Sequence, residues 1–211
     1  MTAVQSQTVV EWMTSLAEDV KAQADHLTQL DAAIGDGDHG INMNRGMAAV
    51  LGALEQQDDG VAPGKLLIAA GRTLVSTVGG ASGPLWGSFF RGVGRALGDA
   101  PEPDAEQLGE ALAAGLKAVQ DLGAAAPGDK TMVDALGPAV EAYRAAVAGG
   151  GGLAEAASAA SEAAAEGAKA TVPLQARKGR ASYLGERSVG HEDPGAASTV
   201  LVMGALARAV G

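Results

Sequence analysis

The chain has 211 residues, a length typical of one large domain, and 47% of them are hydrophobic although only 3% are aromatic. Its formal net charge of −10 argues against non-specific binding to nucleic acid or an anionic membrane, and an anionic substrate would need local cations. The absence of cysteine excludes disulfides, thiolate metal sites and a cysteine nucleophile, and it fits a cytoplasmic protein. The sequence begins without a signal peptide, and no apolar run reaches the roughly 18 residues of a transmembrane helix.

Helical periodicity runs through most of the chain, so we expect an all-α fold of about eight helices with no strand. The expected helices cover residues 9–20, 41–54, 63–78, 84–97, 104–119, 131–143, 153–172 and 194–206. Pro63 and Pro194 suit the first turn of a helix, and Asp104 can cap one. The alanine-rich stretch at 154–170 is predicted to be a close-packed helix, and the glycines at 149–152 a flexible joint.

An acidic segment, LDAAIGDGDHGINMNRGM, occupies residues 30–47. It places Asp31, Asp36 and Asp38 within eight residues, and the glycines between them permit a tight turn that gathers the three carboxylates. Such hard oxygen ligands suit Mg²⁺, Mn²⁺ or Ca²⁺ better than zinc or copper. The sequence therefore predicts a divalent cation site.

Two familiar motifs resemble this acidic segment without fitting it. Residues 35–40 match the dinucleotide pattern GxGxxG, but no strand precedes them and the acids would repel a bare pyrophosphate. A calcium EF-hand loop starting at Asp36 would need a glycine where Ile41 stands and a glutamate where Met47 stands. A Mg²⁺ site of another kind remains, and the alternative is an exposed acidic turn that only caps helices.

Glycine-led turns precede three of the expected helices, at residues 79–84, 128–131 and 193–198. Free N–H groups and the positive end of the helix dipole make such starts suitable for phosphate, although ordinary capping explains each one alone. Residues 123–131 also imitate a P-loop. We reject a Walker A motif because Asp129 stands before Lys130 and Thr131, and because a helix comes first.

Residues 175–193 lack helical periodicity and are long for a loop, which is typical of a functional lid or of disorder. The basic run Arg177-Lys178-Gly179-Arg180 lies within them. It is either a solvated turn or, in this acidic protein, a lid that supplies a cation for a terminal phosphate. His39 and His191 can hydrogen-bond phosphate or ribose.

Together these segments resemble the nucleotide-binding L subunit of bacterial dihydroxyacetone kinase, the DhaL family, which is also the C-terminal domain of single-chain ATP-dependent dihydroxyacetone kinases. The matching blocks are LDAAIGDGDHGINM (30–43), GGASGPLWG (79–87), GDKTMVDAL (128–136) and ARKGRASYLGERSVGHEDPGA (176–196). They span the chain, so the resemblance implies a single ADP/ATP-binding domain over residues 1–211. It implies a barrel of eight antiparallel helices with the nucleotide site at one mouth.

The resemblance also implies the site residues. Asp31, Asp36 and Asp38 would coordinate two Mg²⁺ ions that bridge the nucleotide phosphates, and Arg180 would close the site and act in catalysis with the three aspartates. Gly123, Thr131 and Met132 would lie beside the base and sugar. The remaining residues implied to contact ADP or ATP are His39, Gly40, Asn42, Ala81, Ser82, Asp193, Pro194 and Gly195.

The activity implied is that of a kinase subunit that works only with partners. Bound ADP would be phosphorylated by the phosphohistidine of an M (phosphotransferase) subunit, and the resulting ATP would phosphorylate dihydroxyacetone held on a separate K subunit. Two alternatives stay open. The subunit could exchange ADP for free ATP and serve dihydroxyacetone or a related triose or tetrose, or it could be a non-catalytic Mg-nucleotide module that signals to a transcriptional regulator. A homodimer is also open.

Overall fold

The computed structural model describes residues 3–58 and 60–211, and this part of the chain forms eight α-helices, one short 3-10 helix and no β-strand. The elements are α1 Ser6–Ile34, α2 His39–Leu54, α3 Pro63–Thr77, α4 Ser82–Leu97, α5 Ala105–Gly123, α6 Val133–Ala148, α7 Leu153–Ala170, η1 Arg180–Ser188 and α8 Pro194–Val210. None of these helices combines the length and apolarity needed to cross a membrane. The prediction of an all-helical chain is confirmed.

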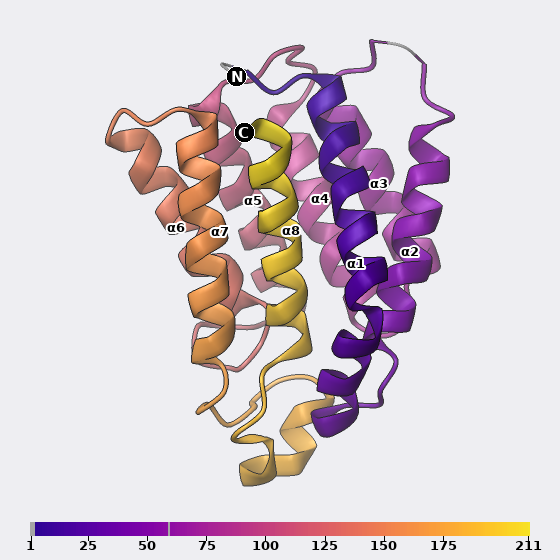
Figure 1. Ribbon diagram of the computed structural model, residues 1–211, viewed down its shortest axis with the longest axis vertical. Helices are drawn as coiled ribbons and strands as arrows, with labels where there is room; N and C mark the ends of the chain where they lie inside the picture. The colour runs from indigo at the N-terminus through magenta and orange to yellow at the C-terminus, as the bar shows by residue number, and fades with distance from the viewer. Residues whose placement is uncertain (1–2, 59) are drawn as a thin grey trace.

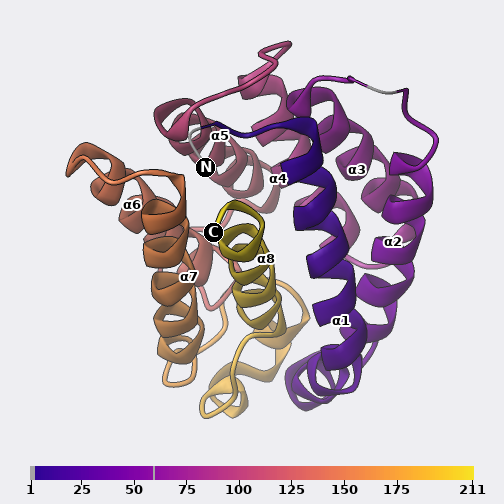
Figure 2. The same ribbon diagram turned by 45° about the horizontal axis from the view of Figure 1, so that its top comes forward.

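The helices follow one another around the molecule. Each packs against the next in the chain, and α8 packs against both α7 and α1, so that the contacts return to where they began. Figure 2 shows α8 lying between α7 and α1. The 3-10 helix η1 lies at one end of the helices and the C-terminus at the other (Figure 1). We call the end that carries η1 the mouth.

Most of the expected helices are found within a few residues of their predicted limits, but the first was predicted too short. The apolar stripe predicts residues 9–20, whereas α1 continues to Ile34. Beyond Val20 the helix buries few side chains, among them Leu27 and Asp31. Asp31 therefore lies on the last turns of a helix, which hold it more rigidly than a loop would.

The segment 175–193, which we call the lid, is not wholly irregular. It contains η1, a 3-10 helix with a kink at Gly185, where φ is 56°. The prediction of a segment without helical structure was therefore wrong for residues 180–188. The hydroxyl of Ser188, a fully buried side chain, accepts from the amide of Ala176 at 2.9 Å and donates to the carbonyl of Gly185 at 2.6 Å. These local bonds fold the lid on itself.

The core combines a few aromatic rings with many small residues. Phe90 stands edge-on to both Trp12 and Phe89, with ring centroids 5.6 and 5.2 Å apart, and Trp86 packs beside them. Edge-to-face pairs of this kind contribute about 0.5–1.5 kcal/mol each beyond burial. The alanine-rich helix α7 is confirmed, and it buries a face of small side chains (Ala156, Ala157, Ala160, Ala164 and Ala168). Small side chains let the helices approach closely on this side.

A close contact between α1 and α2 positions the acidic segment. A Cβ added at Gly40 would stand 1.9 Å from the carbonyl oxygen of Ala24 and 2.7 Å from Oγ1 of Thr28. Only glycine fits there, because any side chain would overlap the α1 backbone. The contact fixes the first turn of α2 against α1, and the short connection between them carries Asp36 and Asp38.

Candidate functional site

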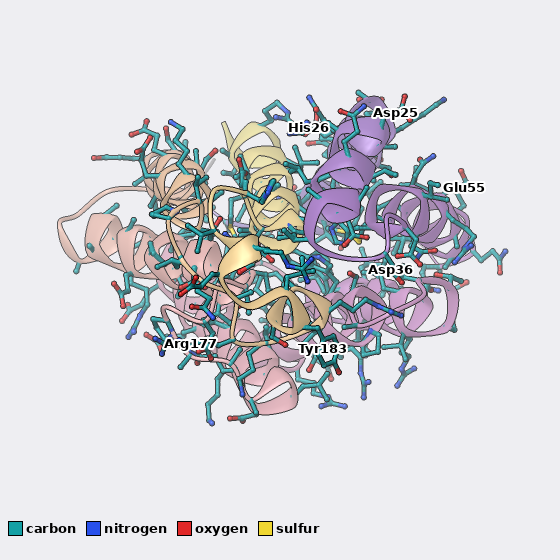
Figure 3. All side chains as sticks on the ribbon, turned by 90° about the horizontal axis from the view of Figure 1, so that it is seen from below. Asp25, His26, Asp36, Glu55, Arg177 and Tyr183 are labelled. Carbon is teal, nitrogen blue, oxygen red and sulfur yellow. The ribbon has the colours of Figure 1, made fainter. Side chains whose placement is uncertain are left out.

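The mouth contains a cavity of about 350 Å³, within the size range of pockets for small ligands. It is lined from almost every side: by the end of α1 and start of α2, the start of α4, the end of α5, residues 130–133, the lid and the start of α8. Figure 3 looks onto this end of the molecule, with Asp36 and Arg177 on opposite sides of η1. The cavity therefore depends on the whole set of helices.

Asp31, Asp36 and Asp38 meet at one side of the cavity, and we call them the acidic cluster. Each offers a carboxylate oxygen within 4.8 Å of the others, and no other such group of acidic or histidine side chains occurs among the described residues. Oδ2 of the buried Asp31 accepts from the backbone amides of Asp38 at 2.9 Å and His39 at 3.2 Å. Gly37, at φ 73°, turns the chain between Asp36 and Asp38, as the glycine spacing predicts.

These donors fit a hard divalent cation. They are all oxygens, one is buried and oriented by amides, and three carboxylates this close repel one another unless positive charge lies among them. The structure thus brings together the residues for which the sequence predicts a metal site.

Arg180 of the lid reaches the acidic cluster. Its Nη2 lies 3.1 Å from Oδ2 of Asp36, in a pair whose side chains remain 66% and 39% exposed. An ion pair this open contributes little stability, about 0–1 kcal/mol. The ion pair matters because it places a planar cation of the lid beside the predicted metal ligands.

His39 begins α2 and bridges to α4. Its Nδ1 lies 2.9 Å from Oγ of Ser82. Burial lowers the pKa of His39 from its ordinary value, and the effect is opposed by Asp31, by Asp38 and by the nearby Pro194 carbonyl. Nε2 is buried and lacks a hydrogen bond of ordinary geometry to the described residues, although the Pro194 carbonyl lies near enough to favour the protonated ring.

The start of α8 closes another side of the cavity. Asp193 caps this helix, and its Oδ2 accepts from the amide of Ala196 at 2.7 Å. The pKa of Asp193 is raised to about 7, chiefly by burial and also by Asp134, while Lys130 and the amides of the helix start oppose the rise. Pro194 and Gly195 line the cavity beside it. Free N–H groups at such a helix start are suited to an anionic ligand.

The other half of the cavity is apolar. Its lining comes mainly from the ends of α4, α5 and α6 (Leu85, Trp86, Val119, Leu122, Gly123, Ala125, Met132 and Val133). An apolar wall opposite charged groups suits a ligand with one flat apolar part and one anionic part.

From the sequence, Lys130 is given no role of its own and is named only within the glycine-led turn 128–131, the matching block 128–136 and a P-loop that we reject, and the structure agrees with that rejection. Its side chain is 1% exposed, and Nζ donates to the backbone carbonyls of Thr171 and His191. The loop follows the helix α5 and not a strand. The residue has φ 61°, and no sequence pattern foretells that backbone conformation or these distant partners.

Most of the predicted ligand-binding residues line the one cavity: Asp31, Asp36, Asp38, His39, Ala81, Ser82, Gly123, Thr131, Met132, Arg180, Asp193, Pro194 and Gly195. Gly40 and Asn42 lie outside its lining. Gly40 packs against α1, and the buried Asn42 accepts from Nη2 of Arg45 at 2.9 Å, behind the turn at Gly79. Their roles as nucleotide contacts stay predictions.

An all-helical fold that gathers three carboxylates, a lid arginine and helix starts opposite an apolar wall defines a domain suited to a metal-bound phosphate compound. The chain belongs to the DAK2 domain family, whose model matches residues 33–208.

The relatives carry names consistent with such a site. The chain is 44% identical over 204 residues to the ADP-binding subunit DhaL of the PEP-dependent dihydroxyacetone kinase of Escherichia coli (strain K12), covering 95% of each chain. It is 37% identical over 203 residues to the DhaL subunit of the PTS-dependent dihydroxyacetone kinase of Lactococcus lactis, covering 96% of this chain and 97% of that one.

A solved structure is also similar. The dihydroxyacetone kinase of C. freundii in complex with AMP-PNP and Mg²⁺ matches with a TM-score of 0.70 and 29% identity. The match covers 99% of this chain and 34% of that longer chain.

Proposed function

We propose that this chain is the ADP-binding subunit of a phosphoenolpyruvate-dependent dihydroxyacetone kinase. Bound ADP receives a phosphoryl group from a phosphohistidine on a carrier subunit, and the ATP so formed phosphorylates dihydroxyacetone held on a separate K subunit. The observation that carries the proposal is the acidic cluster beside a cavity of about 350 Å³, in a chain similar over 95% of its length to such a subunit.

In this proposal Asp31, Asp36 and Asp38 hold two Mg²⁺ ions. Ions held there would supply the positive charge that neutralises the β- and γ-phosphates. Arg180 leaves Asp36 for the terminal phosphate, and the starts of α4 and α8 donate N–H groups to the remaining phosphate oxygens. The apolar wall receives the base, and the lid excludes water that would otherwise hydrolyse the ATP. The side chains position and neutralise charge without forming a covalent intermediate.

We also infer that the helices form the barrel of eight antiparallel helices that the resemblance implies, with the nucleotide at its mouth. The return of contacts from α8 to α1 supports a closed arrangement. The cavity at one end supports the position of the nucleotide.

The surface of the mouth supports the need for partner subunits. The exposed large hydrophobic side chains of the described residues are Ile41, Val75, Leu122, Tyr183 and Val189. Tyr183 and Val189 belong to the lid segment, Leu122 lines the cavity, Ile41 lies on the first turn of α2 and Val75 on the last turn of α3. Tyr183, labelled in Figure 3, is 87% exposed. Apolar groups around the opening suit proteins that must reach the terminal phosphate.

A second candidate is a kinase domain that exchanges ADP for free ATP. The chain is 39% identical to the D-erythrulose kinase of Mycolicibacterium smegmatis, although it spans only 32% of that protein. The near-complete coverage of the separate ADP-binding subunits favours the carrier-fed reaction.

The test is to purify the protein without added nucleotide, denature it and identify the released compounds by chromatography. We expect stoichiometric ADP that survives extensive dialysis. Free release of Mg-ATP and Mg-ADP would favour the exchanging kinase. Failure to bind any nucleotide in the presence of Mg²⁺ would overturn the proposal.

A further inference from the structure

Lys130 is the least exposed charged side chain in the described part of the protein, at 1%. Its ammonium donates to the backbone carbonyls of Thr171 at 2.6 Å and Val172 at 3.4 Å, and to that of His191. An ammonium has three N–H donors, so these three carbonyls use all of them. Lys130 therefore has no donor left for a phosphate, even though it lies at the cavity.

The three carbonyls come from the two places where the lid joins α7 and α8, which we call the ends of the lid. Thr171 and Val172 directly follow α7, and His191 precedes the capping residue of α8. The same two ends also bond to each other, since the amide of Gly190 donates to the carbonyl of Val172 at 2.8 Å. The amide of Asp193 donates to Oγ1 of Thr171 at 3.0 Å. Lys130, which lines the cavity, connects both ends of the lid through its hydrogen bonds.

The neighbours of Lys130 extend this connection. The carbonyl of Asp129 accepts from the amide of Arg177 at 3.0 Å, so the loop before α6 also contacts the lid itself. On the other side, the amide of Thr131 donates to Oδ2 of Asp134 at 2.8 Å, which fixes the loop to α6. The lid is thus tied to the framework through one short loop.

Two features of Lys130 reduce the stability of the folded protein. Its φ of 61° lies in the left-handed region, which lysine rarely adopts and glycine adopts easily. Burial also removes the hydration of the ammonium and lowers its pKa, although Asp193 and Asp134 favour the charged form. Packing alone would not require a lysine here, so its three hydrogen bonds are the reason for it.

We propose that Lys130 is a positioning residue that fixes both ends of the lid, and through them holds Arg180 and the start of α8 over the acidic cluster. The effect on phosphoryl transfer rests on the proposed function. The effect on the lid does not, so the two can be tested separately.

The experiment compares the wild-type protein with the variant Lys130→Met. Methionine keeps an unbranched apolar side chain but removes the three N–H donors of the ammonium. The lid contains four trypsin sites, at Arg177, Lys178, Arg180 and Arg187. In nucleotide-free protein kept well below its unfolding temperature, we expect trypsin to cleave the lid at least tenfold faster in the variant. Cleavage elsewhere and the helical circular dichroism signal should not change. Mg-ADP should also dissociate at least tenfold faster.

Lys117→Met is the matched control. Lys117 is an exposed lysine of α5 that pairs with Asp121 at 2.9 Å, and its loss should leave lid cleavage and Mg-ADP release unchanged. Thr171→Val tests the same lid ends without altering Lys130, because it removes only the hydroxyl that accepts from the amide of Asp193 and donates to the carbonyl of Ala168. This variant should also increase the rate of lid cleavage, but by a smaller factor than Lys130→Met.

Unchanged lid cleavage in folded Lys130→Met, or an equal rise in cleavage over the whole chain, would overturn the proposal. If Lys130→Met does not fold, Lys130→Gln takes its place, because its shorter neutral side chain has two N–H donors and no ammonium, and unchanged lid cleavage in that variant overturns the proposal. Wild-type protein that fails to retain Mg-ADP would count against the proposed function, while the proteolysis without nucleotide would still decide the role of Lys130.

Discussion

The three carboxylates of the acidic cluster have to be compensated by positive charge from elsewhere. Their oxygens lie within 4.8 Å of one another, and Asp36 already has a partner in Arg180. A cation bound at the cluster would compete for the same carboxylate. Metal binding and the freedom of Arg180 to reach a phosphate are therefore linked through a single side chain.

Asp36→Asn tests this residue with almost no change of shape. We expect the affinity for Mg-ADP to fall at least a hundredfold, roughly 2.8 kcal/mol, because one metal ligand and one negative charge are lost. Isothermal titration calorimetry measures the affinity, and circular dichroism should show the helices intact. Asp25→Asn changes an exposed acid on α1, the helix that precedes Asp36, and should have no effect. Equal affinity in the two variants would contradict the metal assignment.

Asp193 should make the protein less stable as pH rises. Its pKa is raised to about 7 in the folded protein, so between roughly pH 4 and 7 the folded state binds more protons than the unfolded state. The free energy of unfolding contributed by this group therefore falls as pH rises through that window. Asp193→Asn keeps an equally good helix cap and removes the titration. Relative to wild type, the variant should gain stability from pH 5 to pH 8 in denaturant titrations; a constant difference would refute the shift.

At the scale of helices, the position of the acidic cluster depends on how closely α1 and α2 approach. Gly40→Ala would place its Cβ 1.9 Å from the carbonyl of Ala24 and force the helices apart. Overpacking of this kind costs about 1–3 kcal/mol, and we also expect weaker Mg-ADP binding because Asp38 moves with α2. Thermal unfolding and calorimetry measure the two effects.

Gly52→Ala is the matched control for this change. Gly52 lies on the same helix, and a Cβ there would meet nothing within 4 Å. The substitution should stabilise the protein by about 0.5–1 kcal/mol, because alanine is the better helix former. A similar loss of binding in both variants would mean that the close contact at Gly40 does not position the cluster.

The helices themselves could be predicted because their apolar residues recur at helical spacing. The end of α1 could not, since the stripe from Val9 to Val20 gives way to mostly exposed residues before Leu27. The 3-10 helix η1 was missed because its order depends on bonds such as that between Ser188 and Ala176. Apolar periodicity predicts which face of one helix is buried, but it does not predict hydrogen bonds between segments that are distant in the sequence.

The same distinction holds for the candidate site. The acidic cluster could be predicted because its three acids lie within one short segment, where glycines imply a turn. Lys130 could not, because its partners Thr171 and His191 are remote in sequence and its left-handed backbone has no sequence signature. Residues that act through distant backbone carbonyls are visible only in the folded chain.

At the scale of the whole molecule, the cavity takes its lining from elements all around the fold, and these elements are tied to one another. Nε1 of Trp12 on α1 donates to the carbonyl of Val202 on α8 at 2.9 Å, and Arg208 of α8 pairs with Asp19 of α1. The first and last helices are thereby joined, although they are remote in sequence. A ligand in the cavity would contact parts of the chain that unfold together.

Binding of Mg-ADP should therefore raise the stability of the whole protein in one cooperative transition. At a hundred times the dissociation constant, a ligand that binds only the folded state adds about 2.7 kcal/mol, which for a chain of this size raises Tm by about 5–10 °C. Because the phosphates are held through the acidic cluster, EDTA should remove the shift even with ADP present. Calorimetric scans with ADP, with Mg²⁺ and with both provide the measurement. A shift that survives EDTA would mean that ADP binds without the acidic cluster, and a second transition would mean that the lid end unfolds separately from the helices.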